Sequence, residues 1–384
     1  MDRKLLLIIL DGVPYRNFRR LFGNLEGWVD SGAARSWKLR SVLPSTSASC
    51  YASIHTGVTP QEHGCTGNGN VFRLGHKDIF SQVRAAGGIT GAVTHSFWSE
   101  FFNRHPFDYV RDVEYDEPES STINHGRFHS MTGYGKANQM TPSDVDLFGT
   151  LTNLCLRFGL NYGILHSCTL DSMGHRFFHD CAEMDHACFV MDEMLAPFIP
   201  RWRQLGYEVI VTADHGQDAR GHHGGRDPLQ QETALYYFGD ADGPEADTVL
   251  DQLQLAPTNL NRLGAPVADT MKAEPFLSEA HSSSGQIPCP NATIATEMRS
   301  NLSAALFTVI RARRYPWTRP GSLIQWAWPP AAVIRSQYSG PSSRIGSQSA
   351  VTTTVGGRCE KSVSCRGAYV GSPSGVPSAQ RTVS

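Results

Sequence analysis

The sequence lacks any long apolar run near its start. The first such run, Leu5 to Leu10, is stopped after six residues by Asp11-Gly12. A membrane-spanning helix needs about 20 apolar residues, and the apolar core of a signal peptide has roughly 7 to 15. We therefore expect a cytoplasmic protein without a signal peptide or a membrane span. The run itself is typical of a buried strand.

The sequence also lacks a disulfide framework and a surplus of charge. Its nine cysteines are scattered over 384 residues, and no two have the spacing of a metal ribbon. A chain of this length can bury its own core, so we expect reduced thiols. The net charge of −2 gives no indication of binding to a nucleic-acid polymer. These absences favour a globular protein, and the sequence leaves its oligomeric state unknown.

What the sequence does contain is a repeated alternation of buried strands and amphipathic helices. This alternation predicts parallel crossovers and an α/β fold, a doubly wound, mostly parallel sheet flanked by helices. Ligands bind beyond the carboxyl ends of the strands in such sheets. The expected strands are Leu5–Leu10, Thr90–His95, Tyr162–Ser167, Tyr207–Ala213 and Thr233–Phe238, and the expected helices are Phe18–Asp30, Ala48–Thr56, Lys77–Ala86, Asp144–Phe158 and Cys181–Leu205.

Two segments break this alternation. Residues 97–142 are rich in aromatic residues and histidine with little periodicity, and we expect an irregular region that caps a pocket. Residues 279–384 are rich in Ser, Gly, Pro and Thr, and only Leu302 to Ala312 has a helical pattern. Such a segment buries too little apolar surface to offset its ordering entropy, which predicts a disordered tail. The expected catalytic domain is therefore residues 1–278.

Polar residues follow the expected strands at several points. Asp11 ends the first strand, although a carboxylate there is more commonly a turn or cap residue. Asp171 and His175 follow the strand ending near Ser167. Four residues apart in a helix or tight turn, they can offer an oxygen and a nitrogen to one cation. The alternative is a helix cap with an incidental histidine.

The strongest cluster follows the strand Tyr207–Ala213. Asp214 and His215 come directly after it, and His222-His223 follow nearby, with glycines that permit sharp turns. Mixed carboxylate and imidazole donors suit Zn²⁺, with Mn²⁺ possible, better than Mg²⁺ or Ca²⁺. The candidate metal ligands from all strand ends are Asp11, Asp171, His175, Asp214, His215 and one of His222 or His223.

A hydroxyl-rich segment, Pro44 to Cys50, enters the expected helix that begins near Ala48. Such residues are usually N-caps. A hydroxyl at the positive end of a helix, activated by a metal ion, is also placed to attack a phosphoryl group. The pattern by itself favours the N-cap.

Taken in order, these motifs resemble the type I phosphodiesterase/nucleotide pyrophosphatase branch of the alkaline phosphatase superfamily. The resemblance runs from Leu5 to about Leu277. The matching motifs are Leu10-Asp11-Gly12, Pro44-Ser-Thr-Ser47, Thr56-Gly57 through His63-Gly64, Thr66-Gly-Asn68-Gly-Asn70, Asp171-Ser-Met-Gly-His175, Thr212-Ala-Asp214-His215-Gly216 and His222-His223-Gly224-Gly225.

The resemblance implies a role for each motif. It places the nucleophile at Ser47, with Thr46 and Ser49 as neighbouring alternatives, and a substrate-binding amide at Asn68. It favours His223 over His222 as a ligand. One metal ion would then be held by Asp171, His175 and His223, and a second by Asp11, Asp214, His215 and Ser47. The implied substrate is a small-molecule phosphate ester, and the implied reaction is hydrolysis of its phosphodiester or pyrophosphate bond through a phosphoserine intermediate.

Other functions of the same fold remain open. A phosphoethanolamine-type transferase or a phosphomonoesterase would have the same metal site, and an inactive member would keep the fold. A sulfatase is disfavoured, because Cys50 is followed by Tyr-Ala-Ser-Ile rather than Cys-x-Pro-x-Arg. A phosphoglycerate mutase of this fold would need a long insertion after the nucleophile, and none is visible.

Overall fold

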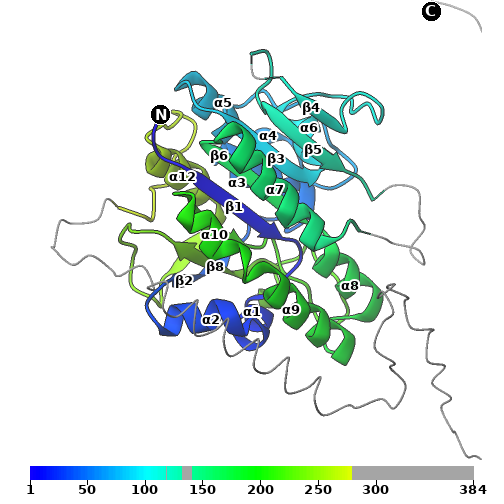
Figure 1. Ribbon diagram of the computed structural model, residues 1–384. Coiled ribbons are helices and arrows are strands. Elements are labelled where there is room, and N and C mark those ends of the chain that lie inside the picture. The colour runs from blue at the N-terminus through cyan, green and yellow to red at the C-terminus, as the bar shows by residue number, and fades with distance from the viewer. Residues whose placement is uncertain (118, 132–140, 279–384) are drawn as a thin grey trace, which may run out of the picture. The chain divides into compact units, whose positions relative to one another are not determined.

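The computed structural model describes residues 1–117, 119–131 and 141–278, which form one nine-stranded sheet with helices on both faces (Figure 1). In chain order the elements are β1 (Leu5–Leu10), α1 (Tyr15–Leu21), α2 (Gly23–Asp30), β2 (Arg35–Arg40), α3 (Ser47–Thr56), α4 (Pro60–His63), α5 (Ile79–Ala85), β3 (Thr90–His95), α6 (Ser96–Phe102), β4 (Glu114–Asp116), β5 (His125–His129), α7 (Asp144–Phe158), β6 (Tyr162–Ser167), α8 (Thr169–Phe177), α9 (Ala182–Leu195), α10 (Phe198–Gln204), β7 (Glu208–Thr212), α11 (Pro228–Gln231), β8 (Glu232–Phe238), β9 (Val249–Asp251), the 3₁₀ turn η1 (Gln252–Gln254) and α12 (Leu255–Leu263).

The sheet has the strand order β4-β5-β3-β6-β1-β7-β8-β2-β9. Strands β5, β3, β6, β1 and β7 are parallel neighbours. Strand β8 runs antiparallel to both β7 and β2. The connection from β7 to β8 carries only the four-residue helix α11 and no long crossover helix. The predicted doubly wound, mostly parallel α/β fold is confirmed.

The central strand β1 is covered on both faces. Its residues alternate between two hydrophobic cores, with Leu5, Leu7 and Ile9 in one and Leu6, Ile8 and Leu10 in the other. Helices α3, α5, α6 and α12 complete the first core, whereas α1, α2, α7, α9 and α10 complete the second. This double burial explains why β1 reads as a continuous apolar run.

Two predicted helices are each divided in the structure. Phe18–Asp30 is α1 and α2, which meet at Phe22. Cys181–Leu205 is α9 and α10, with Pro197 at the break. Proline lacks the N–H that continues a helix and its ring clashes with the preceding turn. The prediction for α7, Asp144–Phe158, matches the structure. Among the described helices, none combines the length and the apolar character required to cross a membrane.

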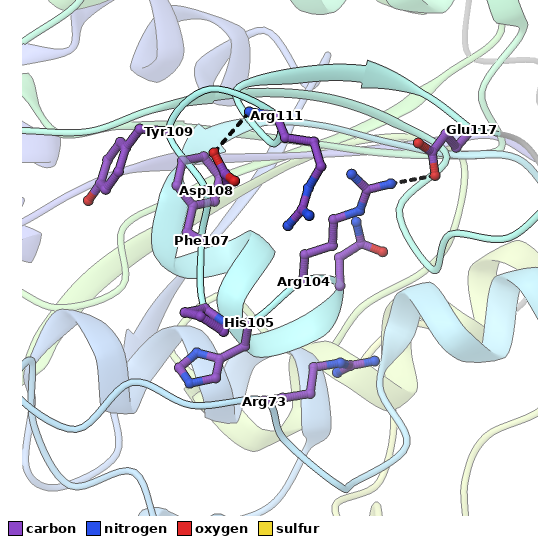
Figure 2. A pocket seen from close by; sticks show the side chains of 10 residues that line it. Arg73, Arg104, His105, Phe107, Asp108, Tyr109, Arg111 and Glu117 are labelled. Carbon is purple, nitrogen blue, oxygen red and sulfur yellow. Dashed lines mark hydrogen bonds and ion pairs between the residues drawn. The ribbon is translucent and has the colours of Figure 1, made fainter.

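The prediction that residues 97–142 are irregular was wrong in part. Helix α6 occupies the start of this segment, and β5 joins the sheet beside β3. Strands β4 and β5, of three and five residues, are too short for a clear periodicity. Part of the segment, with Arg104 and Tyr109, lines an open cavity of about 870 Å³ (Figure 2). Residues 118 and 132–140, and the predicted tail 279–384 with its helix Leu302–Ala312, lie outside the described residues.

Candidate active site

The candidate ligands gather at the carboxyl ends of three adjacent parallel strands. Strand β1 lies between β6 and β7 in the sheet. Asp11 follows β1, helix α8 with Asp171 and His175 follows β6, and the pair 214–215 follows β7. His223 reaches the same place from the loop between β7 and β8. The fold therefore brings together residues that lie far apart in the sequence.

Asp171, His175 and His223 form the first cluster. Asp171 and His175 lie one turn apart on α8, with His175 Nε2 3.3 Å from Asp171 Oδ2. His223 Nε2 lies 3.2 Å from His175 Nε2 and 3.8 Å from Asp171 Oδ1. The backbone oxygen of Ser45 contacts His223 Nδ1 at 3.2 Å, which orients the ring. One potential ligand atom from each residue lies within 4.8 Å of the others.

Asp11, Asp214 and His215 form a second, fully buried cluster. His215 Nε2 lies 3.5 Å from Asp11 Oδ1 and 3.3 Å from Asp214 Oδ2. Its Nδ1 contacts the Gly216 backbone oxygen at 3.0 Å, which leaves Nε2 facing the carboxylates. Asp171 also lies within 4.8 Å of Asp11 and His215, so its carboxylate stands between the two clusters. The two predicted triads are therefore not fully separate in the structure, because Asp171 lies close to both.

In the second cluster, acidic side chains lie close together, and burial and their neighbours shift their pKa values. Burial, followed by the charges of Asp11 and Asp171, raises the pKa of Asp214 well above its usual value. Burial also raises the pKa of Asp11, but hydrogen bonding to His166 and the proximity of His215 outweigh it and leave the pKa lowered. Burial lowers the pKa of His215 to about 4, with His223 adding to the effect. Three carboxylates this close to one another favour a positive charge between them.

Divalent cations fit this donor set. Asp11 Oδ1 and Asp214 Oδ2 are buried and have no hydrogen-bond partner among the described residues. His175 and His223 direct ring nitrogens at each other, although only one of two facing nitrogens can donate a hydrogen to the other. Buried lone pairs without donors are costly unless a cation satisfies them. Mixed carboxylate and imidazole donors are those that zinc accepts.

Ser47 is the first residue of α3, and its hydroxyl faces the second cluster. Ser47 Oγ lies 3.1 Å from His215 Nε2. The hydroxyls of Thr46 and Ser49 hydrogen-bond to each other instead, at 2.9 Å. Asn68 lies beside the same helix end, where its Oδ1 accepts a hydrogen bond from Ala48 N at 2.9 Å. The structure thus places Ser47 and Asn68 together and turns the two alternative hydroxyls toward each other.

Two glycines of the motifs are required by close approach. Gly12 has φ +75°, and a Cβ there would lie 2.8 Å from Asp171 Oδ1. A Cβ on Gly174, within Asp171-Ser-Met-Gly-His175, would lie 1.9 Å from Gln217 Oε1 and 2.6 Å from His179 Nε2. Both positions allow neighbouring segments to pack directly against α8.

The sequence interpretation missed three residues that hold the carboxylates. Tyr51 and His166 both hydrogen-bond to Asp11 Oδ2, His166 through Nε2 at 2.9 Å. Gln217 Nε2 donates to the backbone oxygen of Asp171 at 3.2 Å and also to its carboxylate. The available signals were a histidine inside the apolar strand β6 and a tyrosine one helical turn after Ser47.

The fold, with carboxylates and histidines gathered at one edge of its sheet, is that of a class of phosphoester hydrolases, and the gathered residues are a candidate metal site. The chain belongs to the type I phosphodiesterase/nucleotide pyrophosphatase family, whose model matches residues 5–223, more than half of its length. The predicted family is therefore confirmed.

Individual relatives are distant. Human GPI ethanolamine phosphate transferase 3, catalytic subunit, is 28% identical over 109 residues, which cover 27% of this chain and 10% of that protein. The mouse protein of the same name is 29% identical over 109 residues, with the same shares. The chain thus matches about a tenth of the length of these curated relatives.

Solved structures support the fold. Murine ectonucleotide pyrophosphatase/phosphodiesterase 5 is similar with a TM-score of 0.53 at 11% identity, covering 72% of this chain and 100% of that one. Wild-type alkaline phosphatase PafA is similar with a TM-score of 0.51 at 9% identity, covering 72% of this chain and 99% of that one.

Proposed function

We propose that the protein is a two-metal hydrolase of phosphate esters, acting on phosphodiester or pyrophosphate bonds through a phosphoserine intermediate. The observation that carries this proposal is the position of Ser47. Its hydroxyl lies at the start of a helix and 3.1 Å from His215, beside three crowded carboxylates. A helix start favours a bound phosphoryl group, and the crowded carboxylates favour cations beside it.

Six side chains and Ser47 would hold the cations. One set is Asp171, His175 and His223. The other is Asp11, Asp214 and His215, with Ser47 as an additional ligand. When bound, two divalent ions, with zinc favoured by the donor set and manganese the alternative, would supply the positive charge that lowers the pKa of the serine hydroxyl and offsets charge on phosphate oxygens.

The residues of the chain then carry out the reaction. Ser47 Oγ loses its proton to solvent and attacks phosphorus in line with the leaving oxygen, which departs as a phosphate or, after taking a proton from solvent, as an alcohol. Water attacks the phosphoserine, and Ser47 Oγ leaves. Asn68 Oδ1 accepts a hydrogen bond from Ala48 N, and we assign its amide nitrogen to donate to a non-bridging phosphate oxygen. The role of Asn68 is therefore to hold the phosphoryl group during both steps.

The test is a substrate panel. Phosphate monoesters, diesters and pyrophosphates are assayed with Zn²⁺, Mn²⁺ or Mg²⁺ added to metal-depleted protein. We expect turnover of a diester or a pyrophosphate, restored best by Zn²⁺ or Mn²⁺. Preference for monoesters would replace the diesterase proposal with a phosphomonoesterase. No turnover of any ester under any metal would indicate an inactive member.

A phosphoethanolamine-type transferase is the second candidate. The similarity to the GPI ethanolamine phosphate transferase 3 catalytic subunit favours it, although that similarity spans only 109 residues. Both activities begin with transfer to Ser47, and they differ in whether water or an alcohol accepts the phosphoryl group. Product analysis with and without an added primary alcohol separates them. Water as the sole acceptor supports the hydrolase.

A further inference from the structure

A second group of potential metal ligands lies along the same sheet edge, outside the catalytic residues. His129, His166 and Cys168 each direct one potential ligand atom to within 4.8 Å of the others. His129 ends β5, and Cys168 follows β6. Strand β3 lies between β5 and β6 and is parallel to both, so the carboxyl ends of all three strands lie at the same edge of the sheet. Neither catalytic cluster shares a proposed ligand with this group.

The spacing of two of these atoms suits a zinc ion. Cys168 Sγ lies 3.7 Å from His166 Nδ1. Zinc bonds of about 2.3 Å to sulfur and 2.0–2.1 Å to nitrogen, at a tetrahedral angle, separate the two ligand atoms by about 3.6 Å. The pair therefore stands at the separation that a shared zinc ion requires.

The orientation of His166 is also that of a metal ligand. Its Nε2 lies 2.9 Å from Asp11 Oδ2 and 2.8 Å from the Tyr51 hydroxyl. A carboxylate at Nε2 keeps the hydrogen there and leaves the lone pair on Nδ1, which faces Cys168. Metal-binding histidines regularly donate their other ring nitrogen to a carboxylate in this way.

His129 supplies an independent indication of a missing partner. Its Nε2 is buried and has no hydrogen-bond partner among the described residues. The residue also lines a cavity of about 420 Å³ together with Phe128 and Pro142. Burial without a partner is costly, so a cation that binds this nitrogen would remove the penalty, and the cavity offers it a route of entry.

We propose that His129, His166 and Cys168 bind a third metal ion, a zinc ion, with water in the fourth position. Two imidazoles and a thiolate form a soft donor set that favours zinc over magnesium or calcium. On binding, the Cys168 S–H bond breaks, its proton passes to solvent and sulfur bonds to the metal. Through His166, this ion would also hold Asp11 in place.

Cobalt substitution tests the proposal directly, because sulfur is absent from the proposed catalytic ligands. The full-length chain, metal-depleted and reconstituted with Co²⁺, should show a thiolate-to-cobalt charge-transfer band. Cys168→Ser should abolish the band, and Cys181→Ser, which changes another thiol on the next helix, should retain it. Zinc content should fall from about three equivalents per chain to about two in Cys168→Ser and His129→Ala.

Three outcomes would overturn the third site: no charge-transfer band in the wild type, a band that persists in Cys168→Ser, or equal zinc content in wild type and both variants. These readouts do not depend on hydrolysis. A chain that binds about two zinc ions and hydrolyses esters would refute the third site and leave the catalytic proposal standing. Circular dichroism of each variant separates loss of the ligand from loss of the fold.

Discussion

Neighbouring side chains at the sheet edge differ sharply in what they can bind. His222 and His223 are adjacent, yet the His222 side chain is 67% exposed whereas that of His223 is 10% exposed. His223 Nε2 points to Asp171 and His175, whereas His222 Nδ1 lies 3.8 Å from Asp218 Oδ2. In the sequence analysis, the choice of His223 over His222 as a metal ligand rested on the family resemblance alone. The burial and direction of each ring give it a physical basis.

This difference predicts unequal effects of the two alanine substitutions. His223→Ala should remove about one equivalent of bound metal, because only two ligands of its set remain. His222→Ala should leave the metal content unchanged and serves as the matched control. The measurement is metal analysis of dialysed protein. A larger loss of metal in His222→Ala would reverse the assignment.

At the scale of elements, α8 depends on close packing against the loop after β7. Gly174→Ala would place a methyl group 1.9 Å from Gln217 Oε1 and force Gln217 or His179 to move. Overpacking of this kind costs about 1–3 kcal/mol. Gly174→Ala should therefore lower the urea midpoint, and it should weaken metal binding because Gln217 holds Asp171.

Gly149 in α7 offers the matched control. A Cβ at this helical position has no heavy atom within 4 Å apart from its own helix and chain neighbours. Gly149→Ala should raise the free energy of unfolding by roughly 0.5–1 kcal/mol, since alanine loses less entropy in a helix. Equal effects of the two substitutions would contradict the packing described for α8.

Helix α4 carries a pH-dependent contribution to stability through His63. Its Nδ1 accepts a hydrogen bond from Cys65 N at 3.1 Å, and its Nε2 contacts Ser53 Oγ at 3.0 Å. Burial lowers the pKa of His63 to about 4, with the charge of His76 adding to the effect. The folded state therefore favours the neutral imidazole of His63.

The sign of the pH dependence follows from that lowered pKa. The unfolded chain binds a proton at His63 near pH 6.5 and the folded chain only near pH 4. The contribution is fully present above about pH 6.5 and is lost as the pH falls toward 4. Urea midpoints over this range should decline less in His63→Gln than in the wild type. Identical slopes would show that His63 does not contribute.

For the whole molecule, the pattern of buried runs was sufficient to predict the parallel sheet and the edge at which the candidate ligands gather. Strand β1 was placed correctly because of its continuous apolar run, and helix α7 because of its helical periodicity. Strands β2, β4, β5 and β9 were missed. Strands β4, β5 and β9 have only three to five residues, and β2 has only two apolar residues, Trp37 and Leu39, among charged and polar ones. The contacts of Tyr51, His166 and Gln217 with the site could not be predicted either, since they arise from tertiary packing of distant segments.

The domain assignment makes a prediction about residues 279–384. A chain ending at Ser278 keeps the sheet, both cores and every candidate catalytic residue. It should therefore fold and retain the kcat/KM of the full chain for the preferred ester. The checks are soluble yield, circular dichroism and kinetics. A truncated chain that is insoluble, beside a soluble full-length chain, would show that the fold requires the removed residues.

The central claim is that Ser47, held beside bound cations, performs the chemistry. The most direct measurement is hydrolysis of bis(4-nitrophenyl) phosphate by zinc-reconstituted wild type and Ser47→Ala, with metal content determined on the same samples. The account predicts a fall in kcat on the order of 10³ or more with at most a small change in bound zinc. Thr46→Ala and Ser49→Ala should retain turnover. Wild-type activity in Ser47→Ala, or full activity in metal-free protein, would contradict it.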